Sequence, residues 1–121
     1  MFDLRKDVEK IFRDSNLVFD DTQLMKSIKF TEVLFDWHSK KNLISTQNPQ
    51  HFLKRDFYDS IMLSKFLKGG VNIDVGTGAG IPGLILSILN PDDQFILIDR
   101  REYPIRFLEH IRLILDLGNI E

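Results

Sequence analysis

Apolar residues recur at helical spacing through the first part of the chain. The first predicted helix has one apolar face, made of Leu4, Val8, Ile11 and Phe12. N-cap candidates at residues 20–22 predict a second helix that ends near Trp37, and one stripe of it is made of Leu24, Ile28, Thr31 and Phe35. A polar loop over 39–50 follows, and Asn48-Pro49 predicts the start of a third helix. Its apolar positions before the glycine pair at 69–70 are Phe52, Tyr58, Met62 and Phe66.

The pattern changes after this glycine pair to alternating strands and helices. Short apolar and β-branched runs at 71–75 and 94–98 predict two buried strands. A helix is predicted to begin near residue 81, and another over 104–117, which Gly118-Asn119 is expected to end. The order βαβα predicts an α/β fold with a parallel sheet and right-handed crossovers.

Composition changes this picture little. The chain has 121 residues, of which 43% are hydrophobic and 28% charged, as is typical of one globular domain. Residues 1–70 carry 12 basic against 10 acidic residues and 71–121 carry 4 against 8, so the sum is −2. A nucleic-acid binder often has a much stronger basic excess, so charge alone does not predict an RNA partner. The sequence has no long apolar run and no apolar leader, so we expect a cytoplasmic protein without a membrane segment. It also has no cysteine, so we expect no disulfide.

The stretch "IDVGTGAGIPG" at 73–83 carries the strongest chemical signal. It connects the first strand to its helix at the carboxyl edge of the sheet, where open α/β folds bind ligands. Glycines stand at alternate positions 76, 78 and 80, with Asp74 two residues before the first. Two glycines alone would fit a tight strand-to-helix turn, but three with an acidic residue favour a ligand-binding loop.

The spacing discriminates among nucleotide ligands. A dinucleotide fingerprint would need a glycine where Ile81 stands, and a phosphate-binding P-loop would need a lysine, which does not occur after Lys68. The acidic-x-G-x-G-x-G pattern instead resembles the first motif of Rossmann-like S-adenosylmethionine (SAM) methyltransferases. Asp99, at the end of the second strand, stands where such folds place a carboxylate for the ribose hydroxyls of an adenosine. The alternative for Asp99 is a helix-capping or solvated aspartate, and Asp74 could either hold the amino-acid end of SAM or brace the loop.

Longer matches point to one methyltransferase family. Four segments resemble the bacterial small-subunit ribosomal RNA guanine-N7 methyltransferases, also called glucose-inhibited division protein B. The segments are "FDWHSKKNLIS", "RDFYDSI", "DVGTGAGIPGL" and "IRFLEHIRLILDLGNIE". They occur in the family's order and span nearly the whole chain.

This resemblance implies SAM as cofactor and ribosomal RNA as partner. It implies that Gly76 and Ile81 contact SAM, that Gly78 and Gly80 shape the loop, and that Asp99 lies near the ribose. Residues 1–70 would be a helical extension and 71–121 a partial Rossmann-like SAM-binding unit, together one domain. The motif residues of the extension are Trp37, Asn42, Leu43, Arg55, Asp59 and Ser60. We expect Trp37 and Leu43 to pack in the core, whereas Asp59 and Ser60 could cap a helix or brace the glycine loop.

The chain also departs from the family. Asp56 replaces a histidine and His38 an asparagine, and "RREYPIRF" replaces a flexible turn with Gly-Lys after Asp99. We expect the histidines at 38, 51 and 110 to be structural, no residue pattern predicts a metal site, and no catalytic residue is identified.

The family's members continue with a third strand, whose following loop holds the adenine, and with further strands. The resemblance therefore implies a truncated enzyme with weak or no activity alone. We expect the open edge of the first strand to pair with a second copy or with the missing C-terminal half. The alternative is a non-enzymatic remnant or protein-interaction module built on a partial SAM-binding fold.

Overall fold

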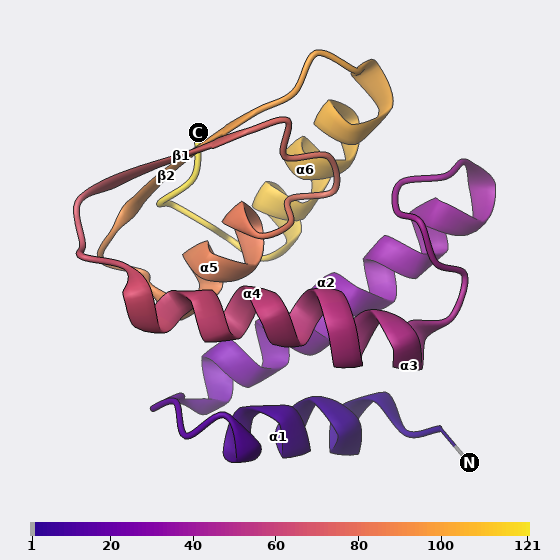
Figure 1. The fold of residues 1–121 in the computed structure, drawn as a ribbon. Coiled ribbons are helices and arrows are strands. Elements are labelled where there is room, and N and C mark those ends of the chain that lie inside the picture. The colour runs from indigo at the N-terminus through magenta and orange to yellow at the C-terminus, as the bar shows by residue number, and fades with distance from the viewer. Residues whose placement is uncertain (1) are drawn as a thin grey trace.

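The computed structural model describes residues 2–121; Met1, the first residue of the predicted helical extension, lies outside the described residues. Figure 1 shows the N-terminal helices layered beneath a two-stranded sheet and its helices, which confirms the predicted α/β class. The elements in chain order are α1 (Leu4–Asp14), α2 (Asp21–Lys40), α3 (Pro49–Phe52), a π-helical segment (Leu53–Phe57), α4 (Tyr58–Leu63), a 3₁₀ turn (Ser64–Phe66), β1 (Val71–Val75), α5 (Gly83–Leu89), β2 (Gln94–Ile98) and α6 (Glu102–Ile114).

Side-chain caps begin the second and third helical regions at the predicted places. Asp20 Oδ1 accepts from the Gln23 amide at 2.8 Å, and Gln23 Oε1 accepts from the Asp20 amide at 2.9 Å. This capping box satisfies two backbone donors that the first turn of α2 would otherwise leave free. At α3 the Asn48 side chain accepts from the amides of Gln50 and His51, without a reciprocal bond.

The third helical region buries Phe52 of the predicted apolar positions, but not Tyr58 or Phe66. Tyr58 and Phe66 are 37% and 76% exposed, and the region ends at Phe66 rather than at the glycine pair. The fully or nearly fully buried apolar residues are Phe52, Leu53, Phe57 and Ile61. The region has two apolar stripes, and the ring of Phe57 contacts that of Phe12 on α1 at 5.9 Å between centroids. Packing against α1 therefore decides which stripe turns inward.

β1 and β2 pair in parallel, as the βαβα order predicts. Val71 lies opposite Gln94, and Val75 lies opposite Ile98. The connecting helix α5 contacts both strands and also α2 and α4, so it lies between the sheet and the N-terminal helices (Figure 1). Leu84 on α5 is fully buried there.

One apolar core is shared by the two predicted parts of the chain. Phe30 of α2 and Phe107 of α6 are fully buried, and their ring centroids lie 6.1 Å apart. Trp37 and Leu43 are partly buried against this core, which confirms their predicted packing role. The division into residues 1–70 and 71–121 stays a prediction, because a shared core does not test it.

The last helix differs from its predicted bounds. α6 begins at Glu102 and ends at Ile114, and the left-handed residue after it is Asp116, with φ 51°, rather than Gly118. The side-chain amide of Asn119 donates to the carbonyls of Ser87, Asn90 and Asp93, each at 3.0 Å. Asn119 therefore ties the chain after α6 to the end of α5 and the turn before β2 instead of ending a helix.

Residues 119–121 pair with β2 on the side opposite β1. The Phe95 amide donates to the Asn119 carbonyl, the Glu121 amide to the Phe95 carbonyl, and the Leu97 amide to the Glu121 carbonyl, each at 2.8 Å. The bridge between Phe95 and Ile120 is parallel. A third strand position therefore begins within the chain, which the sequence pattern did not predict.

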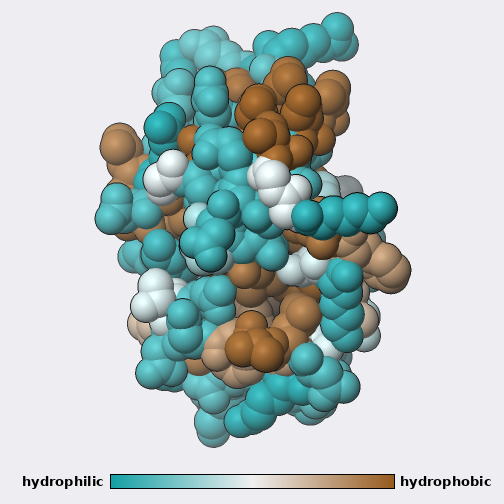
Figure 2. Space-filling model, turned by 90° about the vertical axis from the view of Figure 1, so that its left-hand side faces the viewer, coloured by the Kyte–Doolittle hydropathy of each residue, from teal (hydrophilic) through white to brown (hydrophobic). Residues whose placement is uncertain are grey.

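One face of the sheet is uncovered by any element of residues 2–121. Val71, Ile73 and Val75 are 64%, 63% and 76% exposed, and Ile98 on the neighbouring strand is 46% exposed. Because alternate residues of a strand point to opposite faces, these side chains share the face away from α5. Figure 2 shows a group of hydrophobic atoms in the upper part of the molecule, at the height of the sheet in Figure 1, and another group lower down. We call this set the open sheet face.

Candidate functional site

The glycine loop begins as a direct continuation of the strand pair. The amides of Gly76 and Thr77 both donate to the Ile98 carbonyl, at 2.7 and 3.0 Å. The chain then turns sharply through Gly78 and Gly80, whose φ angles are 57° and 88°. These left-handed conformations are costly for residues with a Cβ, which explains glycine at both positions. Their expected role of shaping the loop fits these backbone angles.

Asp74 braces the two ends of this loop. Its Oδ2 accepts from Thr77 Oγ1 at 2.7 Å and from the Gly83 amide at 3.0 Å. Gly83 allows this close approach, because a Cβ there would lie 2.4 Å from Leu97 Cδ2 and 2.8 Å from Asp74 Oδ2. Of the two roles left open for Asp74, bracing is the one seen in this geometry, and a contact with a cofactor stays a prediction.

Asp99 lies beside the loop with its carboxylate almost fully enclosed. The side chain is 3% exposed. Its Oδ2 accepts from the Gly78 amide at 2.8 Å, and its Oδ1 accepts from the Arg101 amide at 2.9 Å. The Arg101 guanidinium donates to both oxygens, through Nε at 3.0 Å and Nη2 at 2.9 Å.

These contacts keep Asp99 ionised. Hydrogen bonds from the Arg101 side chain are the largest influence and hold the pKa of the Asp99 carboxyl well below its usual range, against the opposing effect of burial. The same contact raises the pKa of Arg101. The residue that caps α6 is Arg101 and not Asp99. Asp99 is therefore not the N-cap residue of α6, and Arg101 shields its carboxylate from solvent in this structure.

An open cavity of about 490 Å³ lies where the two strands end. Its lining residues are Val75, Gly76, Ile98, Asp99, Arg100 and Arg101. A Cβ on Gly76 would meet no atom within 4 Å, so the backbone of the loop is accessible from this side. The cavity thus combines an exposed loop backbone, one enclosed carboxylate and two arginines.

The predicted site residues divide between this cavity and the surrounding structure. Gly76 and Asp99 line the cavity, and Gly78 lies behind Asp99 and Arg101. Gly80 instead faces the core, where a Cβ would lie 2.6 Å from Leu84 Cβ. Ile81 lines a separate, shallow cavity of about 270 Å³, whose other lining residues are Asp56, Asp59, Ser60, Leu63 and Pro82.

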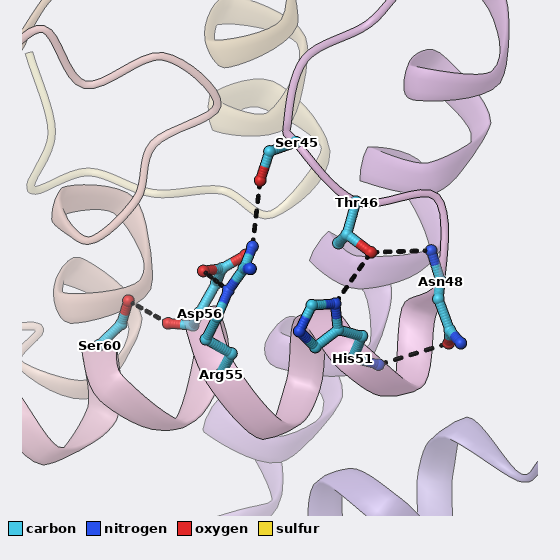
Figure 3. A network of polar contacts seen from close by, with 7 residues as sticks. All are labelled: Ser45, Thr46, Asn48, His51, Arg55, Asp56 and Ser60. Atoms are coloured by element: carbon cyan, nitrogen blue, oxygen red, sulfur yellow. Dashed lines mark hydrogen bonds and ion pairs between the residues drawn. The ribbon is translucent and has the colours of Figure 1, made fainter.

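A polar network surrounds the second motif of the N-terminal helices (Figure 3). Arg55 donates through Nε to Asp56 Oδ1 at 2.9 Å and through Nη2 to Ser45 Oγ at 3.1 Å. The Asp56 carboxylate raises the pKa of Arg55. Ser60 Oγ donates to the Asp56 carbonyl at 2.7 Å, so it bonds to its own helix and not to the glycine loop. Asp56 therefore serves as the partner of Arg55, at the position where the resemblance implies a histidine.

Tyr103 has a structural role that the sequence analysis did not predict. Its hydroxyl donates to the Trp37 carbonyl at 2.6 Å, and the two rings lie 5.5 Å apart. Lys41 Nζ lies 5.4 Å from the centroid of the Tyr103 ring. This contact joins the start of α6 to the end of α2. Its only signal in the sequence was a tyrosine directly before Pro104.

The three histidines lie apart and make different contacts. His38 is buried and its Nδ1 accepts from the Leu43 amide at 2.9 Å, which requires a ring nitrogen without a proton, while its buried Nε2 has no partner in the described structure. His51 contacts Thr46 Oγ1, and His110 packs against Trp37. Within residues 2–121 no three metal-binding side chains converge, and no helix is long and apolar enough to cross a bilayer.

Known proteins match this chain over most of its length. The family model for rRNA small subunit methyltransferase G matches residues 23–121. Curated proteins named ribosomal RNA small subunit methyltransferase G are similar to it: that of Psychromonas ingrahamii is 38% identical over 117 residues (97% of this chain, 56% of the relative). The protein of Aeromonas hydrophila is 38% identical over 110 residues, which are 91% of this chain and 51% of the relative. That of Yersinia pestis is 37% identical over 116 residues, which are 96% of this chain and 56% of the relative. The chain thus spans about half the length of these relatives, and it belongs to the rRNA small subunit methyltransferase G family.

Proposed function

We propose that this chain provides the SAM-binding part of a methyltransferase that acts on guanine N7 of small-subunit ribosomal RNA. The observation that carries this proposal is the enclosed Asp99 carboxylate beside the glycine loop, at the carboxyl ends of β1 and β2. A carboxylate at this place can accept both hydroxyls of a ribose. The family membership supports a methyltransferase, for which SAM is the methyl donor by resemblance.

The residues present fit an adenosyl ligand in three ways. The backbone at Gly76 is open to the cavity, so a ligand can approach it closely. Asp99 is ionised and therefore accepts hydrogen bonds. Asp74 holds the loop from behind through Thr77 and Gly83. We propose that Gly76 and Asp99 contact SAM directly and that Gly78 and Gly80 shape the loop. The proposed contact of Ile81 with SAM rests on the resemblance alone, because Ile81 lines a separate cavity.

The proposed reaction makes modest chemical demands on the protein. SAM supplies a sulfonium methyl group, and the N7 lone pair of guanine forms the new N–C bond as the C–S bond breaks with its electrons retained by sulfur. Guanine N7 carries no proton, so no general base has to remove one before the transfer. The chain's contribution is to hold the donor in a fixed orientation, which alone can lower a barrier greatly.

Titration with SAM tests the proposed site. We expect Asp99→Asn to weaken SAM binding by about tenfold or more in isothermal titration calorimetry, because a hydrogen bond to a charged group contributes about 1.5–3 kcal/mol. Asp92→Asn is the matched control, since Asp92 is exposed and lines a cavity at the opposite ends of the strands. Equal affinity in the two variants would remove Asp99 from the site, and absence of SAM binding in the unaltered chain would count against the function of this chain alone.

We further propose that the open sheet face binds the polypeptide that makes up the other half of the relatives. Parallel sheets are normally covered on both faces, and here four apolar side chains of β1 and β2 are 46% to 76% exposed. The relatives have about twice this length. Residues 119–121 pair with β2 on the side opposite β1, so β1 forms one outer edge of the sheet and is open to a further strand.

Co-expression with the unmatched half of the Psychromonas ingrahamii protein tests this partner. We expect a one-to-one complex with SAM-dependent methylation of small-subunit ribosomal RNA, and we expect Ile73→Lys to abolish the complex because it buries a charge in the contact. Leu113→Lys is the control, since Leu113 is 81% exposed on α6. A complex without methylation would favour the interaction-module alternative. Self-association of the chain alone in ultracentrifugation, abolished by Ile73→Lys, would assign the face to a second copy instead.

A further inference from the structure

The Arg101 side chain stands between Asp99 and any ligand that would use this carboxylate. Four N–H groups donate to Asp99, two from the backbone of Gly78 and Arg101 and two from the Arg101 guanidinium, at 2.8–3.0 Å. A carboxylate has about four lone-pair sites. The Asp99 carboxylate therefore has no free acceptor position for a hydroxyl while Arg101 remains in place.

The two kinds of donor differ in how easily they can leave. The amide groups of Gly78 and Arg101 belong to the backbone of the loop and of the start of α6, so they stay where the fold puts them. The guanidinium is carried by a side chain that is 61% exposed, and it can move into solvent without unfolding any element. Because the guanidinium is exposed to water, its charge is partly screened and it can be solvated when it leaves, so a ligand can compete with it for the carboxylate.

Glycine at 78 makes room for this arrangement. A Cβ at that position would lie 3.3 Å from Arg101 Nη2, which is closer than side-chain atoms usually approach one another. Arg101 Nη2 therefore lies close to the loop backbone at Gly78, and Arg101 lines the same cavity as Gly76 and Asp99. Arg101 also belongs to the segment "RREYPIRF", in which this chain departs from its family.

We propose that Arg101 is a displaceable cap on the ligand-binding carboxylate: its two guanidinium hydrogen bonds to Asp99 must be replaced by the two ribose hydroxyls before an adenosyl ligand can bind. This inference rests on the proposed SAM site. Arg101 thus sets the affinity of the site by competing for Asp99, and it acts on the ligand through Asp99 rather than by contact.

Calorimetric titration of SAM into three variants tests the cap. We expect Arg101→Ala to bind SAM about threefold to fivefold more tightly than the unaltered chain. In this variant the ligand does not have to displace the ion pair between Arg101 and Asp99. Arg101→Lys should fall between the two, since lysine lacks the planar fork that makes two parallel hydrogen bonds to a carboxylate. Arg106→Ala is the control, because Arg106 pairs with Glu102 on the exposed face of α6 and should leave the affinity unchanged.

Nuclear magnetic resonance of the unaltered chain provides a direct readout of displacement. The Arg101 Nε–H signal should be protected from exchange without ligand and should lose this protection as SAM saturates the site. A signal that stays protected in the bound state would overturn the cap, as would an Arg101→Ala affinity that is equal to or weaker than that of the unaltered chain. SAM binding that depends on Asp99 but not on Arg101 would leave the proposed function intact, whereas absence of binding in all variants would overturn both.

Discussion

Replacing Gly80 with alanine should lower the free energy of unfolding by about 2–5 kcal/mol, as the sum of a left-handed backbone cost and an overpacking cost. The φ of Gly80 is 88°, which alanine rarely adopts. A Cβ there would lie 2.6 Å from Leu84 Cβ and 2.9 Å from Leu108 Cδ2. Neither neighbour can easily move, because Leu84 is fully buried and Leu108 nearly so. Urea unfolding followed by circular dichroism measures the loss.

Gly118→Ala is the matched control for this substitution. A Cβ at Gly118 would meet nothing within 4 Å, and its φ lies outside the left-handed range. We expect a change of about 0.5 kcal/mol or less. Equal stabilities for the two alanine variants would mean that the glycine loop is not held against α5 and α6 as described. Gly80→Ala should also weaken SAM binding, because the added Cβ would shift the turn in which the Gly80 amide donates to the Thr77 carbonyl at 3.0 Å.

Replacing Phe57 with alanine should cost about 3–5 kcal/mol of stability, the range found for large-to-small changes at buried aromatic positions. Phe57 is fully buried and meets Phe12 of α1 edge to face. Its loss would leave a cavity between α1 and the π-helical segment, which the rigid neighbours can fill only in part. Thermal unfolding should show the change as a lower melting temperature.

Phe66→Ala provides the control on the same helical region. Phe66 is 76% exposed, so its truncation should change the free energy of unfolding by about 0.5 kcal/mol or less. A larger loss for Phe66 than for Phe57 would show that the apolar stripe predicted from the sequence, and not the observed one, faces the core.

Several features follow from the sequence because neighbouring residues decide them. The capping box needs only Asp20 and Gln23, which are three residues apart. The glycines at 78 and 80 predict left-handed backbone conformations, which other residues adopt only at a cost in free energy. The strands at 71–75 and 94–98 were predicted with the bounds that the structure has, because short β-branched runs end sharply at glycine and turn residues. The loop motif also led to the family to which the chain belongs.

The candidate site could be predicted in part. Sequence spacing placed Asp74, the glycines and Asp99 near one sheet edge, and the structure brings Gly76 and Asp99 to one cavity. The sequence did not predict that the Arg101 guanidinium donates to both oxygens of Asp99. A guanidinium can point in many directions, and its direction here depends on the space beside Gly78. The contacts of Gly76 and Asp99 with SAM stay predictions.

Only the tertiary structure decided which of two apolar stripes in the third helical region is buried, and that residues 119–121 pair with β2. Both outcomes depend on partners distant in the sequence. Phe57 packs against Phe12, and the side-chain amide of Asn119 donates to carbonyls of residues that lie 26 to 32 positions earlier. Local periodicity is the same whichever stripe turns inward, so it cannot choose between them. The sequence by itself therefore determined the local elements, the loop and the family, whereas the choice of buried face and the partners of Asp99 were decided by which surfaces meet when the helices and sheet pack together.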